Sequence, residues 1–116
     1  MDYIWTVKGK DYRLRLKTSS LVMLERTIGR NPLELFGRDG GGLPTTAELA
    51  AVIHAAIQSD RSCTIEVVYD MIDDWLDEGH KYEELFDLIT EIYYGSGVIS
   101  RPEEETKTKN AKKARA

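Results

Sequence analysis

The chain has 116 residues and a formal net charge of −4, enough sequence for one domain with its own core. Its single cysteine, Cys63, excludes an intramolecular disulfide and a cysteine zinc cluster, and fits a reducing cytoplasm. No apolar run approaches the roughly twenty residues of a membrane helix, and residues 1–10 lack the apolar core of a signal peptide. We therefore expect a soluble protein that neither crosses a membrane nor is exported by the signal-peptide route.

Residues 3–17 alternate between apolar and polar side chains on both sides of a turn at residues 8–11. This period of two predicts a β-hairpin with one buried face. The opposite face would carry Arg13, Arg15 and Lys17, and helices would have to cover the apolar face because an isolated hairpin is not stable. The apolar positions are Tyr3, Trp5, Val7, Tyr12, Leu14 and Leu16.

Helical spacing of apolar residues fills most of residues 18–98. Five helical segments are predicted, beginning near residues 18, 32, 46, 64 and 80, and Thr18 to Ser20 can cap the first of them. The spacing of apolar residues places Tyr69 on the inward face of the fourth segment, and Tyr82 and Phe86 on that of the fifth. Thr45 and Glu48 have the spacing of a capping box before the third segment, and Thr64 can cap the fourth. The sequence therefore predicts an α+β, mostly α fold, in which the N-terminal β-hairpin packs on a small bundle of four to five helices.

Domain boundaries follow from composition. Residues 1–100 form one folded domain, whereas residues 101–116 contain no large apolar side chain and are expected to be a disordered, flexible, charged C-terminal tail. Truncation after Ser100 should therefore change the melting temperature little.

The stretch GRDGGGLPTT has glycines at positions 37 and 42, the spacing of a phosphate-binding P-loop. A P-loop needs lysine and then serine or threonine directly after the second glycine, but Leu43 and Pro44 stand there. The stretch is instead predicted to be a loop between two helices.

Charge is distributed unevenly along the chain. Residues 1–62 have a balance of +2, residues 63–100 a balance of −9, and residues 101–116 a balance of +3. The acidic region argues against nucleic-acid binding, because it repels phosphates. Its helical spacing predicts a solvated acidic surface rather than a catalytic acid pair, which would need a pocket.

Nothing in the sequence indicates an enzyme, a metal site or a cofactor site. His54, His80 and Cys63 lack the spacing of zinc ligands, and no serine lies in a nucleophile elbow. Trp75 and Tyr94 lie at the margins of predicted apolar faces, where aromatic residues either mark an interface or complete a core.

The hypothesis for function is therefore partner binding. Opposite charges on the hairpin and on residues 64–94 predict docking of a partner or homo-oligomerisation by head-to-tail contact, weakened by salt. The candidate partner-binding residues are Arg13, Arg15, Lys17, Asp70, Asp73, Asp74, Trp75, Asp77 and Tyr94.

The order of these elements resembles a known family. The local sequences that carry the resemblance are Leu24-Glu25, residues 28–33 (IGRNPL) and residues 68–74 (VYDMIDD). Over residues 3–99 the chain is similar to the tail assembly chaperones of long-tailed bacteriophages, including related gene-transfer-agent proteins. The resemblance implies a helical protein that binds the tape-measure protein and keeps it soluble until the tail tube polymerises.

The resemblance also implies where such a protein acts and with what. It implies the tail tube protein as a second partner, a longer product of the same gene made by ribosomal frameshifting, and no catalytic residues. It places the protein in the bacterial host cytoplasm, encoded by a phage or prophage, and absent from the finished virion. The adjacent Lys112 and Lys113 are compatible with an A-rich slippery run in the gene.

An alternative function of a different class stays open. In this alternative, the chain is a regulatory or antitoxin-like adaptor whose basic hairpin face, with Arg13, Arg15 and Lys17, contacts nucleic acid. Retention on DNA-cellulose at low salt would distinguish the two functions.

Overall fold

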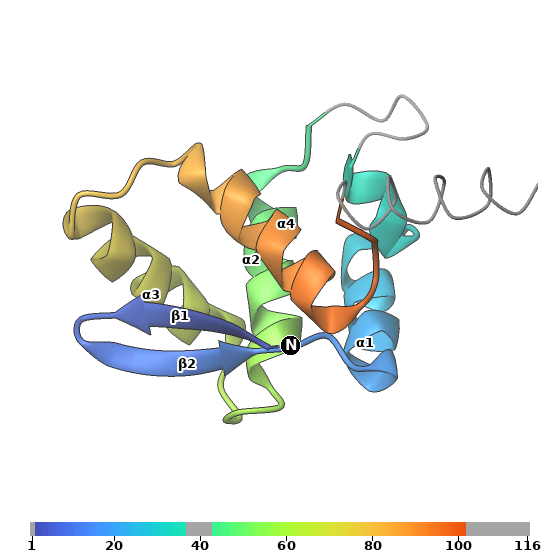
Figure 1. Cartoon of the computed structure of the whole chain (residues 1–116), viewed down its shortest axis with the longest axis horizontal. Helices are drawn as coiled ribbons and strands as arrows, with labels where there is room; N and C mark the ends of the chain where they lie inside the picture. Colours follow the sequence, from blue (N-terminus) through green and yellow to red (C-terminus); the bar gives the residue numbers. More distant parts are fainter. Residues whose placement is uncertain (1, 37–42, 102–116) are drawn as a thin grey trace, which may run out of the picture.

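The computed structural model describes residues 2–36 and 43–101. Residues 37–42 of the predicted glycine-rich loop and residues 102–116 of the tail predicted at 101–116 lie outside the described residues. The elements, in chain order, are β1 (Tyr3–Val7), β2 (Lys10–Leu14), α1 (Thr18–Ile28), the 3₁₀ helix η1 (Pro32–Phe36), α2 (Thr46–Ile57), α3 (Ile65–Asp77) and α4 (Glu84–Ser96). The predicted α+β, mostly α architecture is confirmed (Figure 1).

The strands β1 and β2 form an antiparallel hairpin in which Trp5 lies opposite Tyr12. Its turn is shorter than the predicted four residues. Only Lys8 and Gly9 connect the strands, and both have positive φ, 51° and 76°, as a two-residue type I′ turn requires. The buried face of the hairpin carries Trp5, Val7, Leu14 and, just beyond β2, Leu16.

Helix α2 is the centre of the core. It contacts α1, α3, α4 and β2, and Figure 1 shows it in the middle of the molecule. A helix surrounded in this way must be apolar on all sides, and alanines allow its neighbours to approach closely. Its buried residues are Leu49, Ala50, Ala51, Val52, Ile53, Ala55, Ala56 and Ile57.

The predicted capping box at the start of α2 is confirmed. The Glu48 N–H donates to the Thr45 hydroxyl at 3.1 Å, and the Thr45 N–H donates to the Glu48 carboxylate at 2.9 Å. Thr64 caps α3 as predicted, because its hydroxyl accepts from the Val67 N–H. Helix α1 differs from the prediction: Lys17 is its N-cap residue and makes no side-chain capping bond.

The Glu48 carboxylate also accepts hydrogen bonds from Arg30. The Arg30 guanidinium donates to both carboxylate oxygens, at 2.9 and 3.0 Å. Partial burial alone would raise the pKa of Glu48, but the bonds from Arg30 and Thr45 outweigh burial and hold this pKa below its ordinary value. The carboxylate therefore joins the start of α2 to the segment that follows α1.

Tyr93 joins α4 to η1. Its ring is fully buried, and its hydroxyl donates to the Pro32 carbonyl at 2.8 Å. Phe36 packs edge-on against the same ring, with centroids 4.6 Å apart. Burial raises the pKa of Tyr93, so the hydroxyl keeps its proton throughout the range in which the protein would be handled.

Replacing Tyr93 with phenylalanine should lower the free energy of unfolding by about 1 kcal/mol, because the Pro32 carbonyl loses its partner in a dry site. Urea denaturation would measure this change. Tyr94→Phe is the matched control, since the Tyr94 side chain is only partly buried and its ring-to-Arg101 contact would be kept. Equal effects of the two substitutions would contradict a structural role for the Tyr93 hydroxyl.

Candidate partner-binding site

An apolar groove lies between η1, the start of α2 and α4. It has a volume of about 400 Å³, the size of a site that admits several side chains of a partner. Its lining consists of Leu35, Phe36, Leu43, Pro44, Leu49, Phe86, Ile89 and Thr90, and we call it the apolar groove.

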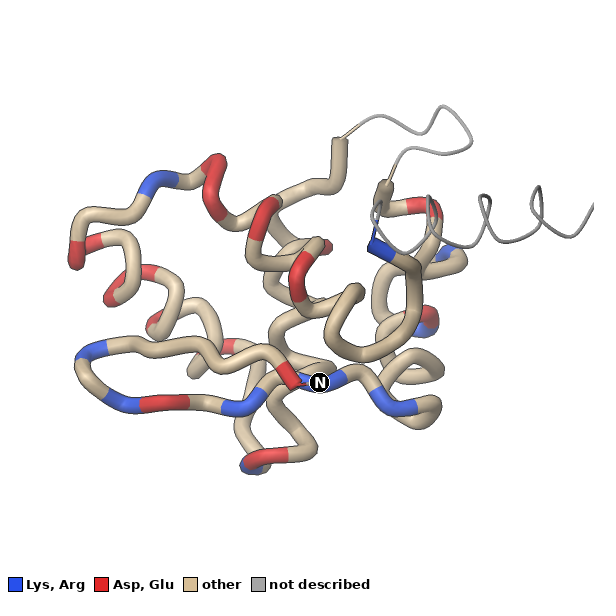
Figure 2. The backbone as a smooth tube through the Cα atoms, viewed as in Figure 1, with Lys and Arg blue, Asp and Glu red and all other residues tan. Residues whose placement is uncertain are grey.

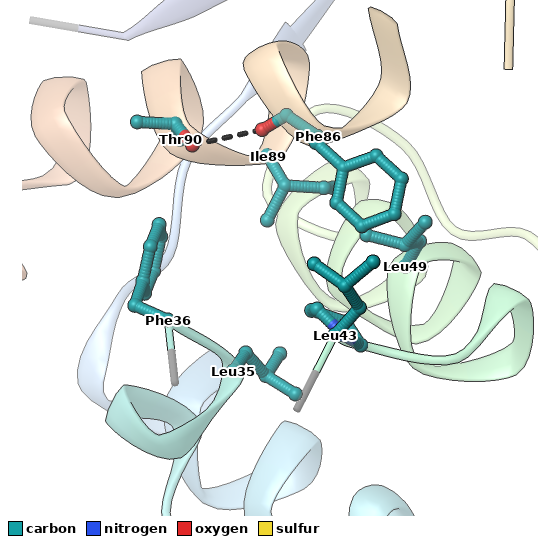
Figure 3. Close-up of a pocket in the computed structure, with 8 residues that line it drawn as sticks. Leu35, Phe36, Leu43, Leu49, Phe86, Ile89 and Thr90 are labelled. Atoms are coloured by element: carbon teal, nitrogen blue, oxygen red, sulfur yellow. Dashed lines mark hydrogen bonds between the residues drawn. The ribbon is translucent and has the colours of Figure 1, made fainter. Parts of the chain in front are cut away.

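Three elements far apart in the sequence build this groove. Figure 3 shows Phe86 and Ile89 extending from α4 toward Leu35 of η1 and toward Leu43. Leu43 is 81% exposed, an unusual position for a large apolar side chain. The groove thus combines a buried floor with an apolar rim that water reaches.

The lining of the groove limits its chemistry. Among the described lining residues, Thr90 has the one polar side chain, and its hydroxyl already donates to the Phe86 carbonyl at 2.8 Å (Figure 3). None of the eight lining residues in the described part of the chain is ionisable. These eight residues therefore provide an apolar surface of the kind that binds apolar side chains.

Helix α4 separates the apolar groove from a second concave surface. This surface has a volume of about 220 Å³, and we call it the acidic groove. Its lining is Tyr3 from β1, Trp75 from α3, His80, and Glu84, Asp87, Leu88 and Glu91 from α4. One helix therefore presents apolar side chains on one face and carboxylates on the next.

The acidic groove contains one of the predicted partner-binding residues, Trp75. Trp75 is only 6% exposed, and its ring stacks on His80 with centroids 4.2 Å apart. It also meets Trp5 edge-on at 6.3 Å. Trp75 therefore belongs mainly to the core and forms the floor of the acidic groove. The sequence had allowed two positions for it, one at an interface and one that completes the core.

The predicted acidic surface follows α3 and α4, as the red segments in Figure 2 show. Asp70, Asp73 and Asp77 are exposed on α3. Asp74 is less exposed, and its carboxylate lies 3.2 Å from the Lys8 ammonium group. The hairpin turn and the acidic helix thus already pair within one chain, which reduces the attraction available for head-to-tail contact.

Tyr94 lies apart from the acidic residues of α3. The Arg101 guanidinium stands 4.9 Å from the centre of its ring and donates to the Glu91 carboxylate at 2.9 Å. Tyr94 and Glu91 therefore hold a guanidinium on the outer face of α4.

The basic residues of the hairpin are exposed, as predicted, but they are not a purely basic surface. The Arg13 and Arg15 guanidinium groups lie 3.6 and 3.7 Å from the Asp2 carboxylate. Asp60 accepts the Arg13 backbone N–H, and Lys17 lies at the start of α1. This mixture of charges weakens the case for the nucleic-acid alternative.

Within residues 2–36 and 43–101, no group of three or more histidine, cysteine, aspartate or glutamate side chains is placed to hold a metal ion. Among the helices of those residues, none combines the length and apolar character needed to cross a membrane.

Sequence reasoning missed the apolar groove. Leu43 and Pro44 served only to argue against a P-loop, although an apolar pair at the end of a glycine-rich stretch was a usable signal. Phe86 was expected in the core, but its ring is partly exposed and meets Tyr82 edge-on at 5.8 Å.

The fold is a small, acidic α+β domain built on a buried central helix, with two grooves on either side of α4. The chain belongs to a family of unknown function, DUF6096, whose model matches residues 4–115. The match covers the described domain and extends into the C-terminal segment. No curated protein and no solved structure matches the chain.

Proposed function

We propose that this protein is a tail assembly chaperone of long-tailed bacteriophages, which binds the tape-measure protein in the host cytoplasm and keeps it soluble until the tail tube polymerises. The observation that carries the proposal is the apolar groove next to an acidic surface. The resemblance of residues 3–99 to that family gives the proposal its particular partner.

The groove suits a partner helix. A tape-measure protein is long and helical, and before assembly its apolar stripes are exposed and prone to aggregate. Apolar side chains three or four residues apart on such a helix can enter a groove formed by Phe86, Ile89 and Leu43. Lysine or arginine beside that stripe would meet the carboxylates on the neighbouring face of α4.

Charge also supports a solubilising role. Residues 63–100 carry a balance of −9, and the exposed Asp70, Asp73 and Asp77 lie on another helix, α3. A bound chaperone would therefore cover apolar surface and add like charge to the complex, and both effects oppose aggregation.

Co-production in bacteria tests the proposal. The probe is the protein encoded by the longest reading frame directly downstream of this gene, made alone and together with this chain. We expect its soluble fraction to rise several-fold on co-production, and Leu43→Asp in this chain to abolish the rise, since a charge would enter the apolar groove. Val22→Asp is the control, because Val22 is 44% exposed on α1, outside the groove.

The proposal fails if the downstream protein is equally soluble without this chain, or if Leu43→Asp and Val22→Asp have the same effect. Two further parts of the proposal have their own tests. Mass spectrometry of induced cells should find a longer frameshift product of the same gene, and the tail tube protein should be retained by this chain if it is a second partner.

A further inference from the structure

The two edges of the hairpin differ in how their backbone groups are used. In a two-residue hairpin the closing pair, Val7 and Lys10, exchanges hydrogen bonds, and hydrogen-bonded pairs then alternate with pairs that point outward. The N–H and C=O groups of Ile4 and Thr6 therefore point away from β2. Those of Asp11 and Arg13 point away from β1.

The rest of the protein covers the edge of β2. The Arg13 N–H donates to the Asp60 carboxylate at 3.2 Å, and the Arg15 N–H donates to the Ala56 carbonyl of α2 at 3.1 Å. These contacts close the edge to another strand along most of its length.

The edge of β1 is open. At the turn, the Lys8 N–H donates to the Glu78 carboxylate. In the part of the chain that the structure describes, the outward backbone groups of Ile4 and Thr6 have no partner. Ile4 and Thr6 are both exposed residues of β1. An open edge of this kind is a template for one more strand.

The surroundings of this edge select the charge of an added strand. Helices α3 and α4 contact β1, and the acidic groove, with Glu84, Asp87 and Glu91, lies between the start of β1 and α4. Glu91 already binds the Arg101 guanidinium at 2.9 Å, and a basic side chain of an added strand could make the same kind of contact with Glu84 or Asp87. A second copy of the chain is disfavoured, because pairing of two β1 edges would bring two acidic α4 helices together.

We propose that the open edge of β1 binds an extended segment of a partner protein by β-strand addition, and that the acidic groove selects segments with basic side chains. Backbone hydrogen bonds to Ile4 and Thr6 supply affinity, and the carboxylates of α4 supply specificity. The inference does not depend on the proposed function, which concerns the apolar groove and other residues of α4, namely Phe86, Ile89 and Thr90.

Binding of a capped nine-residue peptide of alternating lysine and valine tests the proposal on the full chain, with a glutamate–valine peptide of equal length for comparison. Thr6→Pro removes one outward N–H from the edge of β1, where proline is tolerated because that N–H is not part of the hairpin. Asp11→Pro is the matched control, because it removes the outward N–H of the paired residue on the other edge. Both substitutions also remove the same Thr6–Asp11 side-chain bond.

We expect the lysine peptide to bind more tightly than the glutamate peptide at low salt, and Thr6→Pro to weaken binding about fivefold, the loss of one backbone bond. Asp11→Pro should leave the affinity within about twofold. Amide NMR signals of Ile4 and Thr6 should shift and gain protection from exchange when the peptide binds. Absence of binding, equal binding of the two peptides, equal effects of the two prolines, or unchanged Ile4 and Thr6 signals would each overturn the proposal.

Discussion

Replacing Ile53 with alanine should lower the free energy of unfolding by about 3 kcal/mol, a loss typical of a fully buried isoleucine. Ile53 is fully buried in the middle of α2, which contacts three helices and the hairpin, so no neighbour can move to fill the space. Urea denaturation monitored by circular dichroism would measure the loss.

Two control variants make this expectation specific. Ile53→Val removes one methyl group and should cost about 1 kcal/mol. Val22→Ala, at a half-exposed position on α1, should change stability by no more than about 0.5 kcal/mol. A loss below about 1 kcal/mol for Ile53→Ala would contradict the central place of α2, because buried isoleucines rarely cost so little.

Replacing Glu48 with alanine should lower the free energy of unfolding by about 2 kcal/mol, because the Arg30 guanidinium and the Thr45 N–H both lose the carboxylate to which they donate. Glu48→Gln is the graded control. A glutamine oxygen can still accept the Thr45 N–H, but the charge that binds Arg30 is gone, so about half of the loss should remain. Thermal or urea unfolding at pH 7 would measure both variants.

The contribution of Glu48 to the free energy of unfolding should also depend on pH. Its pKa in the folded protein lies below the ordinary value of 4.5, so the folded state favours the carboxylate. The resulting stabilisation is present above that ordinary pKa and is lost as the pH falls through the folded pKa. The stability difference between the wild type and Glu48→Gln should therefore be constant near neutrality and shrink below about pH 4. A difference that grows with acid would contradict the ion pair.

Local signals in the sequence were sufficient to predict the elements. Alternation on both sides of Gly9 predicted the hairpin, and the Thr45–Glu48 spacing predicted the start of α2, because each depends on residues a few positions apart. The turn length was wrong, since Lys8 adopts a positive φ that its residue type does not indicate.

Contacts between distant residues could not be predicted in the same way. Arg30 and Glu48 are separated by 18 positions, and Tyr93 and Pro32 by 61, so no short pattern links them. Helical periodicity placed Tyr69 and Tyr82 inward, yet both are exposed, because the width of an apolar face depends on which neighbours pack on it.

The candidate site, too, could be predicted only where it depends on residues close together in the sequence. Its acidic residues were visible in the composition, whereas the apolar groove needs Leu35, Leu43 and Phe86 to come together from three elements. From the sequence, Trp75 could be either a core residue or an interface residue. In the structure it is buried and stacks on His80, which makes it mainly a core residue.

The central claim is that the apolar groove holds the partner of this protein. Isothermal titration of the protein encoded directly downstream, which we propose to be the tape-measure partner, or of a soluble segment of it, into wild type, Leu43→Asp and Val22→Asp tests this claim most directly. We predict that Leu43→Asp raises the dissociation constant at least about tenfold, since a charge would replace an apolar contact at the edge of the groove. Val22→Asp should change the dissociation constant by less than about twofold. Equal affinity of wild type and Leu43→Asp would contradict the claim.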